Sequence, residues 1–147
     1  MKRVHVSLRV ADLDRSVAFY NQLFGMEPTL LKSDYAKWMP ADPPILLSIV
    51  TGGAPGLDHL GIQSEDEADV NALHERVAPT QAAPAETRCC YAESTKSWLH
   101  DPDGTAWENF TTHRQTEDFC EDPEAESTSS CFVPASPVEA VETSSCC

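Results

Sequence analysis

Two histidines and one glutamate occupy positions that suit a metal site. His5 lies in the segment RVHVSLRV and His59 in the segment LDHLGIQ, and in both segments apolar and polar residues alternate. This alternation places each histidine on the strand face opposite the apolar residues. Glu108, in TAWENF, shares a face with Phe110, and a carboxylate buried there requires a cation. Two histidines and one carboxylate form the ligand set of non-haem Fe(II) oxygenases, although Mn, Co and Zn accept the same ligands.

A second group of residues that could do chemistry is the adjacent pair Cys89 and Cys90 in ETRCCYA. Two neighbouring thiolates suit a soft, thiophilic atom such as trivalent arsenic, although cysteine also serves as a small buried hydrophobe. Adjacent strand residues face opposite sides of a sheet, so both sulfurs reach one atom only where the strand is bulged or ends. We therefore predict a bulge or loop at 88–91. Arg88 and Lys96 could lower the pKa of these thiols, but surface solvation is the expected role of each.

The three ligand candidates also have a structural interpretation. A single strand histidine is commonly a hydrogen-bonded structural residue, but His5 and His59 occupy equivalent places in two similar segments, which favours the metal site. The remaining histidines, His74, His100 and His113, are expected to be solvated.

The elements that must position these residues repeat once along the chain. Residues 1–52 are predicted to form a strand, a helix that ends at Gly25, and three strands. Residues 57–111 repeat this order, with an acidic helix whose Val70, Leu73 and Val77 should face inward. Such a repeat indicates two half-domains that pair to bury a shared face. The predicted fold class is α+β, with two paired βαβββ units forming a cupped mixed sheet.

Composition limits the remaining possibilities. The chain has 147 residues, six cysteines and a formal net charge of −14, which disfavours binding to nucleic acid or to an anionic membrane. The N-terminus lacks a long apolar run, so we expect a cytoplasmic protein, in which cysteines indicate metal, metalloid or redox chemistry. Residues 1–111 should form one domain and residues 112–147 a disordered acidic tail. Two interpretations of the tail cysteines stay open: they capture arsenicals or pass product on, or they have no role. These cysteines are Cys120, Cys131, Cys146 and Cys147.

The paired βαβββ units, the two strand histidines and DPDGTAWENF resemble the vicinal oxygen chelate superfamily over residues 1–111. That superfamily includes glyoxalase I, fosfomycin-modifying transferases and extradiol dioxygenases. Glyoxalase I usually takes a fourth, acidic ligand from the last strand of the first unit, but the matching segment PPILLSIVTG has no acid. The resemblance therefore favours members with three ligands.

The segment TRCCYAESTKSWLHDPDGTAWENF resembles, more narrowly, the carbon–arsenic bond lyases that act on trivalent organoarsenicals, a group related to cadmium- and arsenic-inducible proteins. This resemblance implies that Cys89 and Cys90 bind the arsenic. It also implies that Fe(II), held by His5, His59 and Glu108, binds dioxygen as co-substrate. The implied reaction converts a substrate such as methylarsenite to inorganic arsenite in arsenic detoxification.

Two other functions stay open from the sequence. A non-catalytic protein that sequesters cadmium or arsenic would bind through its cysteines and need no dioxygen. A thiol transferase acting on fosfomycin would use the same three metal ligands but would not need adjacent cysteines. The preferred organic substituent, the metal bound in the cell and the formation of a homodimer are also left open.

Overall fold

The computed structural model describes residues 1–78 and 80–118, which form two halves with the same element order. The first half contains β1 (Arg3–Val10), α1 (Leu13–Phe24), β2 (Leu30–Leu31), β3 (Tyr35–Trp38) and β4 (Ile45–Thr51). The second half contains β5 (Gly56–Gln63), α2 (Glu67–Val77), β6 (Ala85–Cys89), β7 (Ala92–His100) and β8 (Ala106–Gln115). The predicted pair of βαβββ units is confirmed.

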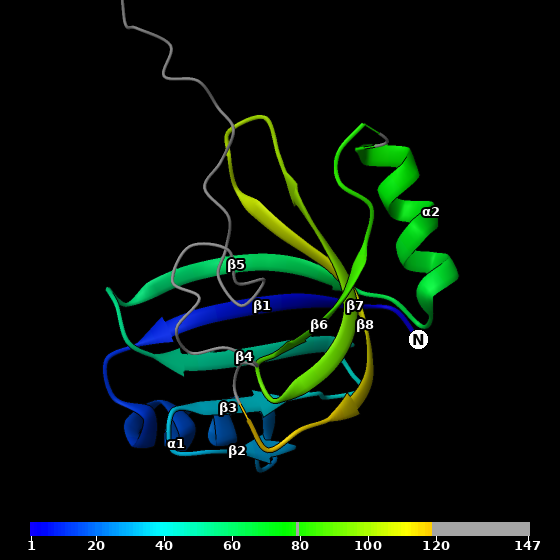
Figure 1. The fold of residues 1–147 in the computed structure, drawn as a ribbon. Helices are drawn as coiled ribbons and strands as arrows, with labels where there is room; N and C mark the ends of the chain where they lie inside the picture. The colour runs from blue at the N-terminus through cyan, green and yellow to red at the C-terminus, as the bar shows by residue number, and fades with distance from the viewer. Residues whose placement is uncertain (79, 119–147) are drawn as a thin grey trace, which may run out of the picture.

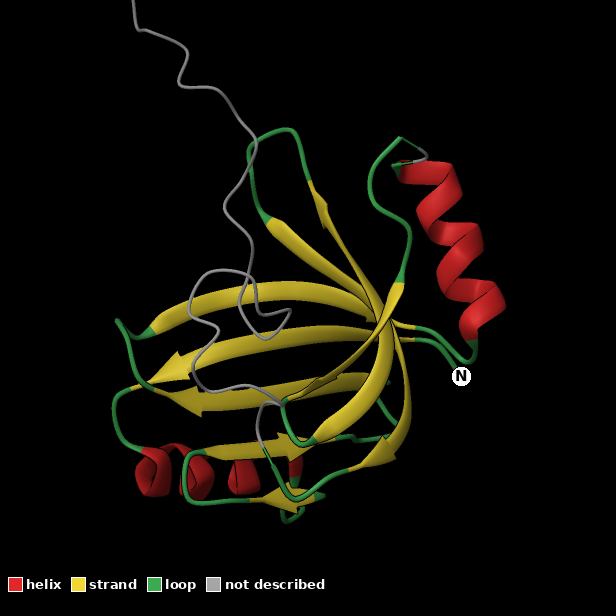
Figure 2. Cartoon of the chain, viewed as in Figure 1, coloured by secondary structure: helices red, strands yellow, loops and turns green. Residues whose placement is uncertain are grey.

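All eight strands belong to one mixed sheet with the order β2-β3-β4-β1-β5-β8-β7-β6. The halves join where β1 pairs with β5 in antiparallel fashion, and the parallel pairs β1–β4 and β5–β8 flank this joint. The sheet curls so that the β6–β7 hairpin faces the strands of the first half, and both helices lie outside the curl (Figures 1 and 2). The inner face is therefore a cup to which both halves contribute.

Helix α1 covers the outer face of the first half. Asp12 caps its N-terminus by accepting a hydrogen bond from the backbone N–H of Arg15, and Gly25, with a φ of 64°, ends it in the left-handed conformation. Its Tyr20 and Phe24 rings pack against the fully buried Trp38. The outer core thus fixes β3 and β4 and leaves the inner face of the sheet for polar side chains.

Helix α2 packs on the second half differently from the sequence expectation. Val70 is fully buried, as expected, but Val77 is 54% exposed. His74, which was expected to be solvated, is only 2% exposed. His74 lies four residues after Val70, one turn further along the same helix face, so the buried face includes it. That face continues from Val70 to His74 and leaves Val77 at its edge.

The last strand is longer than expected. The sequence placed the end of the domain at 111, but β8 continues through Gln115, so residues 112–115 belong to the sheet. The backbone N–H of Thr116 then donates to the carbonyl of Tyr91. The rest of the expected tail, with its four cysteines, lies outside the described residues. Within the described ranges, neither helix has the length and apolar character needed to cross a membrane.

Candidate metal and thiol site

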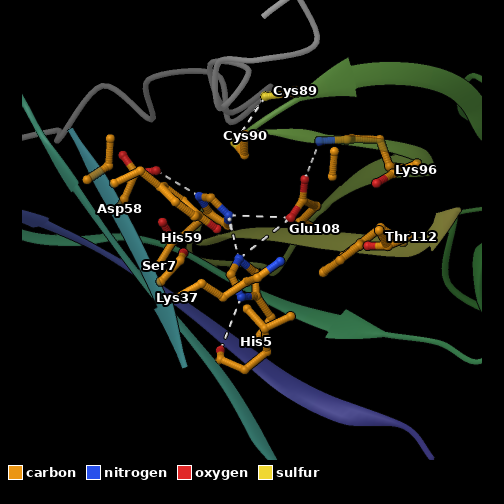
Figure 3. A pocket seen from close by; sticks show the side chains of 17 residues that line it. His5, Ser7, Lys37, Asp58, His59, Cys89, Cys90, Lys96, Glu108 and Thr112 are labelled. Atoms are coloured by element: carbon orange, nitrogen blue, oxygen red, sulfur yellow. Dashed lines mark hydrogen bonds and ion pairs between the residues drawn. The ribbon is translucent and has the colours of Figure 1, made fainter. Parts of the chain in front are cut away.

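His5, His59 and Glu108 converge on the inner face of the sheet (Figure 3). The Nε2 atoms of the two histidines are 3.2 Å apart, and Glu108 Oε2 lies 3.7 Å from the first and 3.6 Å from the second. Their exposed fractions are 4%, 8% and 7% in chain order. The structure thus brings together the three residues that the sequence singled out, all from one chain.

The outer nitrogen of each histidine fixes its tautomer. His5 Nδ1 is 3.2 Å from the carbonyl oxygen of Leu46, which can only accept, so Nδ1 carries the proton. His59 Nδ1 is 2.8 Å from Oδ2 of Asp58, and the other oxygen of this carboxylate, Oδ1, accepts from Arg9 Nε at 2.6 Å. Both Nε2 atoms therefore point at the same place.

Two imidazole nitrogens and a carboxylate that face each other in a buried site need a proton or a metal cation between them. The donor set therefore fits a divalent metal ion with positions left for other ligands. Neither Asp58 nor Arg9 was predicted from the sequence. The only signal for Asp58 was its place next to His59, where its side chain would ordinarily point to the other face of the strand.

The protein's own charges set the protonation of these groups. Burial lowers the pKa of His5 to about 4, against the opposing charge of Glu108. Burial also tends to lower the pKa of His59, but its hydrogen bonds to Asp58 and Glu108 prevail and bring the pKa to about 9. Burial would raise the pKa of Glu108, yet Lys96 and the two histidines hold it well below its usual range. Glu108 is therefore ionised and available as a ligand.

Gly61 allows the close packing behind these ligands. It pairs with His5 on one side and with Glu108 on the other, at the centre of the sheet. A Cβ atom at this position would lie 2.5 Å from the Glu108 carbonyl oxygen and 3.2 Å from His5 Cδ2. Only glycine lets the two ligand-bearing strands approach β5 this closely.

The cysteine pair lies at the tip of the β6–β7 hairpin. The strand pairing ends with Cys89 opposite Ala92, so Cys90 and Tyr91 form a two-residue turn, with φ angles of 56° and 61°. The loop predicted at this point is confirmed. Because Cys89 ends the strand and Cys90 already belongs to the turn, their Sγ atoms can lie 3.1 Å apart, and both thiols are free. The difficulty that neighbouring strand residues face opposite sides is thereby removed.

The two thiols are not equivalent. The hydrogen bond with Cys90 lowers the pKa of Cys89, and Lys96 acts in the same direction. The same bond, together with burial, raises the pKa of Cys90 well above its ordinary value. The pair therefore holds one proton much more tightly than the other, which suits stepwise replacement of hydroxyl groups on a thiophilic atom.

Residues of the first half hold the cysteine turn in place. The Tyr91 hydroxyl donates to Asp34 at 2.5 Å, the Tyr91 ring lies 5.7 Å from that of Tyr35, and Lys32 Nζ lies 5.3 Å from the ring centre. Burial and the bond to Asp34 raise the pKa of Tyr91 to about 12, so its hydroxyl stays a donor. Two non-glycine residues with positive φ are strained, and these contacts hold them there.

Both groups of residues line one cavity of about 70 Å³. Buried lysines stand in its wall: Lys96 Nζ donates to Glu108 Oε1 at 2.6 Å (Figure 3), and Lys37 Nζ donates to Gln115 Oε1 at 3.3 Å. The expectation that Lys96 is solvated is wrong, because it is only 7% exposed and faces the cup. Arg88 instead pairs with Glu93 at 2.7 Å and does not line this cavity.

Three relatives match between three quarters and all of the chain. A "Trivalent organoarsenical cleaving enzyme" of Bacillus sp. (strain MD1) is 37% identical over 164 positions, covering 100% of this chain and 99% of that protein. One of the same name from Thermomonospora curvata is 40% identical, covering 75% and 77% of the two chains. The "Cadmium-induced protein CadI" of Mycobacterium bovis is 35% identical, covering 88% of each.

Solved structures agree on the fold. The Mn(II)-bound glyoxalase from Novosphingobium aromaticivorans matches with a TM-score of 0.54 at 19% identity, covering 83% of this chain and 43% of that chain. An extradiol ring-cleaving dioxygenase from B. fuscum matches with a TM-score of 0.53 at 16% identity, covering 78% and 34%. The family model described as Glyoxalase/Bleomycin resistance protein/Dioxygenase superfamily matches residues 2–109. With this curled sheet and these full-length relatives, the chain belongs to the glyoxalase/bleomycin resistance protein/dioxygenase superfamily.

Proposed function

We propose that the protein cleaves the carbon–arsenic bond of trivalent organoarsenicals such as methylarsenite, with Fe(II) as cofactor and dioxygen as co-substrate. The observation that carries this proposal is the shared cavity, which holds a two-histidine, one-carboxylate ligand set and a pair of thiols 3.1 Å apart. The names of two relatives that span most of the chain support the same reaction. We place the reaction in the cytoplasm, in one chain or in a homodimer.

The reaction balances without a further reductant. Methylarsenite, CH3As(OH)2, and O2 together contain the atoms of arsenous acid, As(OH)3, and formaldehyde. The carbon loses four electrons as it passes from an arsenic-bound methyl group to formaldehyde, and dioxygen takes up these four electrons. Arsenic is trivalent in the substrate and in the product. The bonds that break are C–As, O–O and one methyl C–H, and the bonds that form are the carbonyl C–O of formaldehyde, one As–O and one O–H.

In this proposal each group of the cavity has a defined task. Cys89 and Cys90 replace the two hydroxyl groups of methylarsenite, release water and hold the arsenic with its methyl group free. Fe(II), held by His5, His59 and Glu108, supplies the open coordination and the electron transfer that dioxygen chemistry needs. The cavity of about 70 Å³ favours a small substituent, since a cavity that takes benzene measures about 150 Å³.

The first test is anaerobic reconstitution with Fe(II), addition of methylarsenite and admission of air, with the arsenic species separated and counted. We expect inorganic arsenite only when both Fe(II) and O2 are present. Cys89→Ser and His59→Ala form a matched pair of variants, because the first should keep Fe(II) and lose arsenic binding, and the second should do the reverse. Arsenite formation by either variant at the wild-type rate would contradict the proposal.

Sequestration of cadmium or arsenic without turnover is the second candidate, favoured by the thiol pair and by the name of the mycobacterial relative. In that case methylarsenite would stay bound and unchanged in air. Glyoxalase chemistry is less favoured, because β4 lines the cavity with Leu46, Ser48 and Val50 and offers no acid there. A fosfomycin transferase would tolerate the loss of both cysteines, so Cys89→Ser also tests that reaction.

A further inference from the structure

Lys96 is a buried cation between the candidate metal ligands and the thiols. It comes from β7, where it pairs with Phe110 of β8, two residues beyond Glu108 and on the same face. Its side chain points into the cup and ends at Glu108 (Figure 3). The charges of Cys89 and Cys90 act on it as well. A lysine with so little exposure is kept charged by neighbouring anions, and Glu108 is the nearest one that the structure gives it.

The two oxygens of Glu108 have different partners. Oε1 accepts the 2.6 Å hydrogen bond from Lys96 Nζ, while Oε2 faces the two histidine Nε2 atoms at 3.6 and 3.7 Å. A carboxylate can bind a metal through one oxygen or through both. A charge-assisted hydrogen bond of this length occupies Oε1 strongly and fixes the plane of the carboxylate. Only Oε2 is then directed at the place where the histidine lone pairs meet.

We propose that Lys96 is a positioning residue that restricts Glu108 to ligation through one oxygen and so keeps a coordination position free for the co-substrate. This inference rests on the proposed metal site and adds to it the reason why the site stays open. If Lys96 served only to neutralise a buried carboxylate, its loss would weaken folding or metal binding. If it positions Glu108, its loss frees Oε1 to occupy the position that a small ligand needs.

The test compares Lys96→Met with Lys2→Met, which removes an exposed lysine that pairs with Asp69 and does not line the cavity. Each protein is loaded with Fe(II) without air, and its Fe(II) affinity is measured by competition with a chelator. Nitric oxide, a surrogate for dioxygen that binds Fe(II), is then titrated and followed by electron paramagnetic resonance. For Lys96→Met we expect Fe(II) affinity at least equal to that of the wild type and nitric oxide affinity lower by about 10–100-fold. Lys2→Met should resemble the wild type in both.

The outcomes distinguish failure of the metal site from failure of the role proposed for Lys96. If the wild type fails to bind Fe(II), the metal site itself is refuted. If the wild type and Lys96→Met bind Fe(II) and nitric oxide alike, the role of Lys96 is refuted and the metal site stands. Should Lys96→Met not fold, as judged by circular dichroism, the crystal structure of the Fe(II)-loaded wild type decides. One Glu108 oxygen within about 2.0–2.2 Å of the metal supports the inference, and two oxygens at that distance overturn it.

Discussion

At the residue scale, the site depends on atoms that hold the ligands as much as on the ligands themselves. Strand alternation was enough to predict His5, His59 and Glu108. Successive residues of a strand point to opposite faces, so the apolar residues of each strand show which face the others occupy. The sequence carried no comparable signal for the Asp58 bond to His59 or for the burial of Lys96. These depend on side-chain directions across paired strands, which a single strand pattern does not determine.

Asp58 provides a prediction at this scale. Its carboxylate orients the His59 ring and holds the proton on Nδ1, so that Nε2 faces the metal position. Asp58→Asn removes the charge that favours this tautomer and should lower Fe(II) affinity by about 10–100-fold, measured by chelator competition. Asp69→Asn, which changes a partly exposed aspartate paired with Lys2, is the matched control and should bind Fe(II) like the wild type. Equal affinities for all three proteins would show that Asp58 has no such role.

At the scale of elements, the hairpin between β6 and β7 converts two adjacent cysteines into a chelating pair. The sequence predicted an irregularity at this point, because a regular strand would separate the sulfurs. It did not predict that Tyr91 would reach Asp34, since the two are 57 residues apart and lie in different halves. Neither Cys90 nor Tyr91 favours a positive φ, so contacts from the first half must hold the turn.

Tyr91→Phe tests how far these contacts position the thiols. The variant keeps the ring packing and loses a hydrogen bond to a carboxylate, a bond that contributes roughly 1.5–3 kcal/mol. We expect the affinity for methylarsenite to fall by about tenfold, since about 1.4 kcal/mol corresponds to that factor. Fe(II) affinity should stay the same. Tyr20→Phe, on the outer helix, is the control for equilibrium dialysis, and unchanged arsenic binding in Tyr91→Phe would contradict a positioning role.

At the scale of the whole molecule, two similar halves build one cup, and each supplies one histidine. The repeat was visible in the sequence because both halves carry the same order of patterns, so the element order and the paired units could be predicted. The end of the domain could not, because residues 112–115 have no strong apolar alternation and join the sheet through pairing with β7. These residues pair with β7 directly after the cysteine turn, where Gln115 lies opposite Ala92, and so help to hold the turn in place.

Truncation separates the domain from the rest of the chain. A chain that ends after Asp118 keeps all of β8, the hydrogen bond from Thr116 to Tyr91 and the ion pair between Lys32 and Glu117. We expect it to turn over saturating methylarsenite at the wild-type rate. A chain that ends after Thr112 loses these contacts and should bind arsenic more weakly and unfold at a lower temperature. Loss of turnover in the longer, folded chain would show that residues beyond 118 take part in the reaction.

The central claim is that dioxygen cleaves the C–As bond while arsenic is held by the thiols beside Fe(II). The most direct measurement follows O2 uptake, arsenite and formaldehyde together in one reaction of the Fe(II)-loaded protein with methylarsenite. The account predicts that one O2 is consumed for each arsenite and each formaldehyde formed. Arsenite released without O2 uptake, or methylarsenite that stays bound and unchanged in air, would contradict it.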